Sequence, residues 1–189
     1  MRRTNPMNCF SPIVLACALA VPAFAQDAKT NAVPGPDKPA SAEIPPPMQS
    51  FPASAAVLSA PLVLTNDYLY LASDQAEVTN GGNAVFNFTV TNSGNYLIEA
   101  LVNAPGEDAN SFYLNVDAQP EDPDMIWDID VTSGFEKRTV SWRGNGDTDS
   151  DQFVPKKFKL TPGAHNLIII GREPGTLLKS LSIRPAPPQ

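Results

Sequence analysis

AVFNFTVT, residues 84–91, places an apolar side chain at every second position. YLIEALVN (96–103) and SFYLNVD (111–117) repeat this alternation. Successive side chains of a strand point to opposite faces, so each stretch predicts a strand with one dry and one wet face. No window of about a dozen residues keeps the 3.6-residue apolar spacing of a helix, so the sequence predicts an all-β fold.

Turn-forming residues separate these stretches from further short apolar runs. The groups NGG (80–82), SGN (93–95) and TPGA (161–164) supply a positive or preset φ. About ten short strands with such turns predict a two-sheet antiparallel β-sandwich, or jelly roll, over residues 62–184. The other strand candidates are 62–65, 68–72, 125–131, 138–143, 158–160, 165–171 and 177–184.

Residues 1–25 have the pattern of a signal peptide. Arg2-Arg3 precede an apolar run over 10–21, and Ala23-Phe24-Ala25 forms a small-x-small cleavage site. Cleavage after Ala25 predicts a secreted or periplasmic bacterial protein with no membrane insertion afterwards. The alternatives are an uncleaved anchor and lipoprotein processing at Cys17.

Cleavage there changes the charge and the cysteine content of the predicted mature chain. Removing Arg2-Arg3 and no acidic residue lowers the formal charge from −7 to −9. Both cysteines, Cys9 and Cys17, are removed, so disulfides and thiolate metal sites are excluded. The sequence shows no basic stripe, which argues against nucleic acid as a partner.

Residues 26–61 have the composition of a disordered linker that precedes the sandwich. The stretch contains eight of the 20 prolines, together with many alanines and serines. Such a segment buries too little apolar surface to offset its ordering entropy. It is either a spacer that holds the domain away from a surface or a tail without a task. Residues 185–189 predict a second disordered tail.

The motifs of an enzyme are missing from the sequence. His165 is the single histidine, and no G-x-S-x-G motif is present to supply a nucleophile. One histidine also excludes a three-histidine zinc site. We therefore predict a non-enzyme, with His165 in a packing role and Arg172-Glu173 as a structural charge pair.

Trp127 and Trp142 are candidates for stacking on the apolar face of a sugar, and each has a polar neighbour, Asp128 or Arg143. The alternative is that both rings are core, because Trp127 alternates with apolar residues. Polar residues near them form a second group, for which an ordinary solvated face is the alternative. The candidate ligand-binding residues are Tyr113, Asp117, Trp127, Arg138, Trp142, Arg143 and Asn145, with Asn115 on the same strand face as Tyr113.

Two acidic stretches raise the question of calcium. Asp147, Asp149 and Asp151 alternate in one loop, and a longer acidic run covers 117–130. Calcium takes six to eight oxygen ligands, but the loop lacks the glycine and distal glutamate of an EF-hand. The prediction is no metal or cofactor, with calcium as the alternative.

Five segments carry a resemblance to a known group of proteins. They are GNYLIEA (94–100), NSFYLNVD (110–117), TSGF (132–135), LTPGAHNL (160–167) and GREPG (171–175). In this order they resemble the galactose-binding-like carbohydrate-binding jelly rolls of families six and thirty-five and their malectin-like relatives. The resemblance implies a β-sandwich that binds a glycan or polysaccharide without catalysis.

The sequence departs from that group where its loop-tip sugar site should be. Arg138 occupies the position of an aromatic ring, and Thr176-Leu177 occupies that of an asparagine. The Glu-rich opening strand that helps to hold a structural calcium is not evident at 68–74. A sugar would therefore bind on another surface. The alternatives are a cell-envelope structural or protein–protein interaction sandwich, and an accessory domain for a hydrolase on another chain. The oligomeric state stays open.

Overall fold

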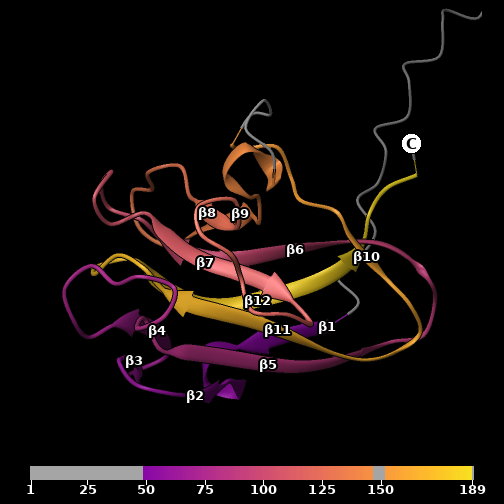
Figure 1. Cartoon of the computed structure of the whole chain (residues 1–189), viewed down its shortest axis with the longest axis horizontal. Coiled ribbons are helices and arrows are strands. Elements are labelled where there is room, and N and C mark those ends of the chain that lie inside the picture. Colours follow the sequence, from indigo (N-terminus) through magenta and orange to yellow (C-terminus); the bar gives the residue numbers. More distant parts are fainter. Residues whose placement is uncertain (1–48, 147–151, 189) are drawn as a thin grey trace, which may run out of the picture. The chain divides into compact units, whose positions relative to one another are not determined.

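The computed structural model describes residues 49–146 and 152–188, which form two antiparallel sheets packed face to face (Figure 1). The predicted β-sandwich is confirmed. The helices in this part of the chain are two 3₁₀ turns, η1 (Ala53–Ala55) and η2 (Arg143–Gly146), and neither is long or apolar enough to span a bilayer. The predicted signal peptide and residues 26–48 of the predicted linker lie outside the described residues.

The larger sheet has seven strands in the order β10-β6-β12-β4-β3, with β1 paired to β12 and β9 paired to β6. Every pairing in it is antiparallel. The bounds of its strands are β1 Gln49–Pro52, β3 Leu62–Thr65, β4 Tyr68–Leu71, β6 Gly94–Asn103, β9 Glu136–Thr139, β10 Phe158–Leu160 and β12 Leu177–Pro185.

The smaller sheet has five strands in the order β2-β5-β11-β7-β8, again all antiparallel. It is the nearer sheet in Figure 1, in front of β6 and β12. Its strands are β2 Val57–Leu58, β5 Asn83–Val90, β7 Ser111–Val116, β8 Ile126–Asp128 and β11 Gly163–Gly171.

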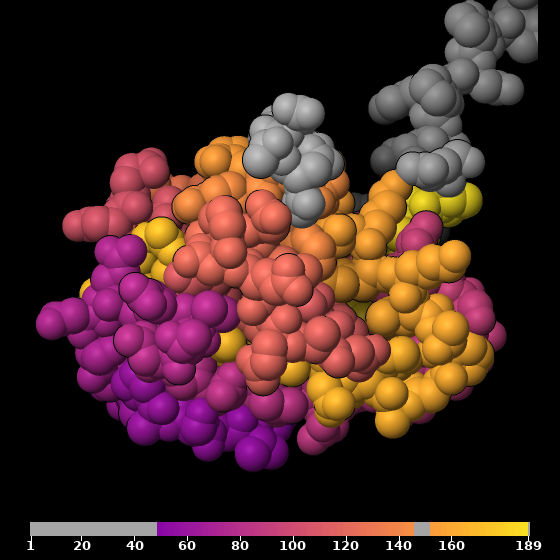
Figure 2. Space-filling view, in the orientation of Figure 1, coloured from indigo at the N-terminus to yellow at the C-terminus, as the bar shows by residue number. Residues whose placement is uncertain are grey.

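The core lies between the sheets and is built from the alternating positions. Every second residue of β5 and β6 is buried, from Phe86 and Phe88 on one sheet to Ile98 and Val102 on the other. Removing this apolar area from water, at about 25 cal/mol per Å², is the main stabilising contribution. Figure 2 shows that side chains fill the gaps that the ribbons leave open.

The sandwich begins earlier than predicted. Gln49–Pro52 pairs with β12, Val57–Leu58 pairs with β5, and Ala53 between them is fully buried. The prediction of a disordered linker is therefore wrong for residues 49–61. The proline content suggested disorder, but Pro52 is the last residue of an edge strand. Proline has no N–H, and at that position the sheet loses no hydrogen bond.

Three other predicted boundaries also change. The predicted tail is wrong for Pro185, which pairs with Tyr96, and for Ala186, whose N–H donates to the carbonyl of Asn95 at 2.8 Å. The candidates at 125–131 and 138–143 shorten to Ile126–Asp128 and Glu136–Thr139.

Candidate functional site

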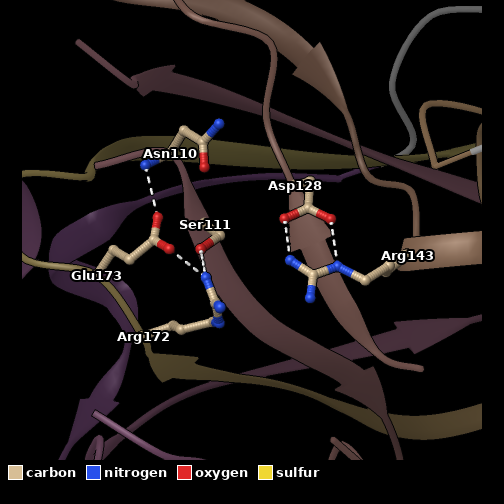
Figure 3. A network of polar contacts seen from close by, with 6 residues as sticks. All are labelled: Asn110, Ser111, Asp128, Arg143, Arg172 and Glu173. Carbon is tan, nitrogen blue, oxygen red and sulfur yellow. Dashed lines mark hydrogen bonds and ion pairs between the residues drawn. The ribbon is translucent and has the colours of Figure 1, made fainter. Parts of the chain in front are cut away.

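Polar side chains from five parts of the chain meet at the end of the smaller sheet where β7 begins and β8 and β11 end, and Figure 3 shows four of these parts. They line a depression of about 340 Å³ that we call the polar hollow. Its lining residues are Glu107, Asn110, Asp128, Arg143, Gln152, Arg172 and Glu173.

Asp128 and Arg143 form the first fixed pair of the polar hollow. Asp128 is the last residue of β8, pairs with Ser111 and is buried. Arg143 is the first residue of η2. Arg143 Nε and Nη2 donate to the two carboxylate oxygens of Asp128, each at 2.9 Å. These hydrogen bonds are the largest cause of the raised pKa of Arg143. The bidentate geometry holds both groups in one orientation.

Arg172 and Glu173, which follow β11, form the second fixed group. The N–H of Asn110 donates to Glu173 Oε2 at 2.9 Å, and Arg172 Nη1 donates to Glu173 Oε1. Arg172 Nη1 also donates to Ser111 Oγ at 2.6 Å. The predicted charge pair of Arg172 and Glu173 is confirmed. Because Glu173 is buried, the network also fixes the start of β7.

A second depression, of about 300 Å³, adjoins the first at Asp128, and we call it the mixed hollow. It combines apolar surface, including Phe153 at 44 % exposure, with charged groups. Arg138 Nη2 contacts Glu136 at 2.9 Å, while its buried Nε has no hydrogen-bond partner among the described residues. The lining residues are Trp127, Asp128, Ile129, Asp130, Lys137, Arg138, Thr139, Ser141, Phe153 and Pro155.

Both tryptophans belong to the core, as the alternative interpretation held. Trp127 is 1 % exposed and Trp142 is 8 % exposed. Trp142 Nε1 donates to the carbonyl of Leu114 at 2.8 Å, and its ring meets Phe158 edge-on at 5.8 Å. Leu114 and Phe158 lie in different sheets, so Trp142 ties the sheets together. The prediction that these rings stack on a sugar is corrected, because neither has an open face.

The strand face of Tyr113 and Asn115 is covered rather than open. Tyr113 is 3 % exposed and packs with Ile126 and Ile170 in a small apolar cluster on the outer side of the smaller sheet. In Figure 2, atoms of the segment that follows β7 spread over this part of the molecule. The prediction of a wet face is therefore wrong for β7, and Tyr113 is not available to a ligand.

Asp117 lies beyond the end of β7 opposite to the polar hollow and has a local partner. Its φ is 63°, and its carboxylate accepts from the N–H of Asn166 at 2.9 Å and contacts His165 Nδ1 at 2.6 Å. It lines neither hollow. The packing role that the sequence predicts for His165 agrees with its burial and its stacking on Phe88.

Of the other predicted residues, Arg143 lines the polar hollow and Arg138 lines the mixed hollow. Asn145 lines neither, and its φ of 51° and its N–H bond to the carbonyl of Trp142 serve the turn. Sequence reasoning did not include the other residues of the polar hollow among its candidates, nor Phe153 of the mixed hollow, and it gave Arg172 and Glu173 a structural role. The missed residues of the polar hollow are Glu107, Asn110, Asp128, Gln152, Arg172 and Glu173. Charged residues directly after the apolar strand 163–171 were the one available signal for the polar hollow.

No group of three or more histidine, cysteine or acidic side chains within residues 49–146 and 152–188 is arranged to hold a metal ion. The acidic run over 117–130 belongs to this part of the chain. The loop aspartates Asp147, Asp149 and Asp151 lie outside the described residues.

Comparisons with known proteins give matches by structure. No family model matches the chain, and no curated protein sequence matches it significantly. A family 35 carbohydrate-binding module from Clostridium thermocellum matches with a TM-score of 0.51 and 12 % identity, over 73 % of this chain and 99 % of the module.

Two enzymes also match over part of their length. A β-(1,4)-mannanase from Podospora anserina that includes a family 35 module matches with a TM-score of 0.51 and 12 % identity, over 75 % of this chain and 28 % of the enzyme. An exo-β-1,3-galactanase from Phanerochaete chrysosporium, solved with galactose, matches with a TM-score of 0.51 and 11 % identity, over 72 % of this chain and 29 % of the enzyme. This chain thus spans less than a third of either enzyme. The described residues therefore have the β-sandwich fold of family 35 carbohydrate-binding modules, which is the fold that the sequence resemblance implies.

Proposed function

We propose that this chain is a secreted, non-catalytic glycan-binding module whose ligand lies over the polar and mixed hollows. The observation that carries the proposal is the shared wall of the two hollows. Asp128 borders both and is held by two hydrogen bonds from Arg143. A sugar needs an apolar surface for its C–H face and fixed polar groups for its hydroxyls, and here the two lie next to each other.

The character of the hollows supports binding without reaction. The carboxylates of Asp128 and Glu173 are each engaged by an arginine. Glycoside hydrolysis needs two carboxyl groups that face the scissile bond, whereas these two carboxylates face arginines. The structural neighbours support the same class, since one is a whole carbohydrate-binding module and two are enzymes that act on polysaccharides. Secretion rests on the predicted signal peptide.

The test is retention on a glycan array and on polysaccharide affinity gels. Phe153→Ala and Gln152→Ala change exposed residues of the two hollows, and we expect Phe153→Ala to weaken binding roughly tenfold, or by about 1.4 kcal/mol. Leu64→Ala is the matched control, because Leu64 is also partly exposed but lies on β3 of the other sheet.

The proposal predicts that the wild type and the control bind the glycan equally well and that the two site variants bind it more weakly, with melting temperatures unchanged. If the wild-type chain binds no glycan but captures a cell-envelope protein, the alternative of a protein-interaction sandwich replaces it. If both site variants bind as the wild type does, the ligand does not lie over these hollows.

A further inference from the structure

The polar hollow has more negative than positive formal charge. Three carboxylates line it, those of Glu107, Asp128 and Glu173, against the guanidinium groups of Arg143 and Arg172. Each arginine already forms an ion pair with a carboxylate of the hollow. Glu107 is exposed and has no ion pair with any described residue. Counting these five groups, the hollow has one uncompensated negative charge.

The surroundings of the hollow add to this negative field. Asp122 and Glu173 act on Arg143 in addition to Asp128, and together they raise the pKa of its guanidinium. Burial is the largest cause of the raised pKa of Tyr113, and Asp122 adds to it, while Arg172, which lies 6.0 Å above the ring, lowers it. Asp122 thus adds a further carboxylate that acts on Arg143 from outside the lining of the hollow.

The groups left for a ligand suit hydroxyls better than an anion. The two N–H groups of Arg143 Nη1 have no hydrogen-bond partner within the described part of the chain, so they can donate to a ligand. The carboxylates next to them are acceptors only. A sugar hydroxyl both donates and accepts, so it can bridge a guanidinium and a carboxylate. A ligand carboxylate can only accept, and it would face Asp128, Glu173 and Glu107 at close range.

We infer that the polar hollow accepts an uncharged sugar residue and discriminates against a sugar acid, with Glu107 as a determinant of that choice. This inference rests on the proposed function, because it names the ligand class of the same site. Arginines alone would predict the opposite, since a free guanidinium binds a carboxylate bidentately. Here both arginines are already neutralised by buried partners, and Glu173 also accepts a hydrogen bond from the N–H of Asn110.

The experiment compares one neutral oligosaccharide, selected on the glycan array, with the same oligosaccharide bearing C6 carboxylates. Titration calorimetry at low and at physiological ionic strength gives the ratio of the two dissociation constants. We expect the neutral form to bind roughly three- to tenfold more tightly, the effect of one unit charge at about 7 Å in a partly solvated site. The ratio should shrink as salt is added.

Glu107→Gln should bring this ratio close to one, because it removes the uncompensated charge without breaking an ion pair. Glu121→Gln removes the same charge from an exposed position outside both hollows and should leave the ratio as in the wild type. Equal or tighter binding of the acid by the wild-type chain would overturn the inference and leave the proposed function standing. So would a ratio that Glu107→Gln does not move. If neither form binds, the proposed function fails and this inference fails with it.

Discussion

His165 has both ring nitrogens next to oxygen acceptors. Nδ1 lies 2.6 Å from Asp117 Oδ2, and Nε2 lies 2.7 Å from the carbonyl oxygen of Thr161. A carbonyl oxygen can only accept, so Nε2 has a proton, and the carboxylate favours a proton on Nδ1 as well. The hydrogen bond to Asp117 is the largest cause of the raised pKa of His165. The charged imidazolium therefore fits this site better than the neutral ring.

This arrangement predicts a dependence of stability on pH. The folded-state pKa of His165 lies above the unfolded value near 6.5, so the pair stabilises the fold fully below that pH. The contribution is lost as the pH rises through the folded-state pKa. Asp117→Asn keeps the shape and tolerates the positive φ of 63°. Urea unfolding should show the variant less stable than the wild type at pH 5.5, with a smaller difference at pH 8.5. A difference that does not vary with pH would contradict the charged pair.

At the scale of the elements, the long strands could be predicted and the edges could not. The alternation in 84–91 and 96–103 places the same side chains in the core that the structure buries. Leu97 is an exception, because it is buried although the alternation places it on the wet face. In 111–117 the pattern is equally clear, yet the face predicted to be wet is covered, because Tyr113 is buried and packs with Ile126 and Ile170. Alternation indicates which side chains share a face, but it does not tell what covers that face.

The site was harder to predict than the fold for a related reason. Asn110, Asp128, Arg143 and Arg172 become neighbours only because the ends of β7, β8 and β11 meet at one edge of the smaller sheet. The sequence interpretation chose Trp127 and Trp142 because aromatic rings stack on sugars, but rings of this size fit a protein core equally well. Arg138 and Arg143 were found because they were near these rings in sequence, and the structure places one in each hollow.

The edge elements β1, η1 and β2 should contribute to the stability of the sandwich. A chain that starts at Leu62 loses the four-residue ladder of β1 with β12 and exposes the surface that Ala53 covers. At about 1 kcal/mol for each lost hydrogen bond, the loss from roughly four bonds is about 4 kcal/mol. Chemical denaturation of chains that start at Gln49 and at Leu62 measures this difference. Equal stability of the two chains would show that residues 49–61 do not stabilise the sandwich and act as the linker that their composition suggests.

At the scale of the whole described domain, one apolar cluster joins the two sheets. It includes residues of β5 and β7 from the smaller sheet and of β6 and β12 from the larger one. Because each sheet buries its apolar face only against the other, neither can stay folded alone. The sandwich should therefore behave as a single cooperative unit.

Both tryptophans report on that shared core, which makes the cooperativity measurable. Trp127 packs against Phe112 in the smaller sheet, and Trp142 contacts Phe158 of the larger sheet while it donates to the carbonyl of Leu114. For a domain of this size we expect two-state unfolding, with tryptophan fluorescence and far-ultraviolet circular dichroism giving one midpoint in urea. Trp127→Phe and Trp142→Phe each leave a single tryptophan. Both variants should be less stable than the wild type, but within each variant fluorescence and circular dichroism should give the same midpoint. Within one variant, a fluorescence midpoint that differs from the circular dichroism midpoint would show that the sheets come apart in steps, because the remaining ring would then follow its own part of the core.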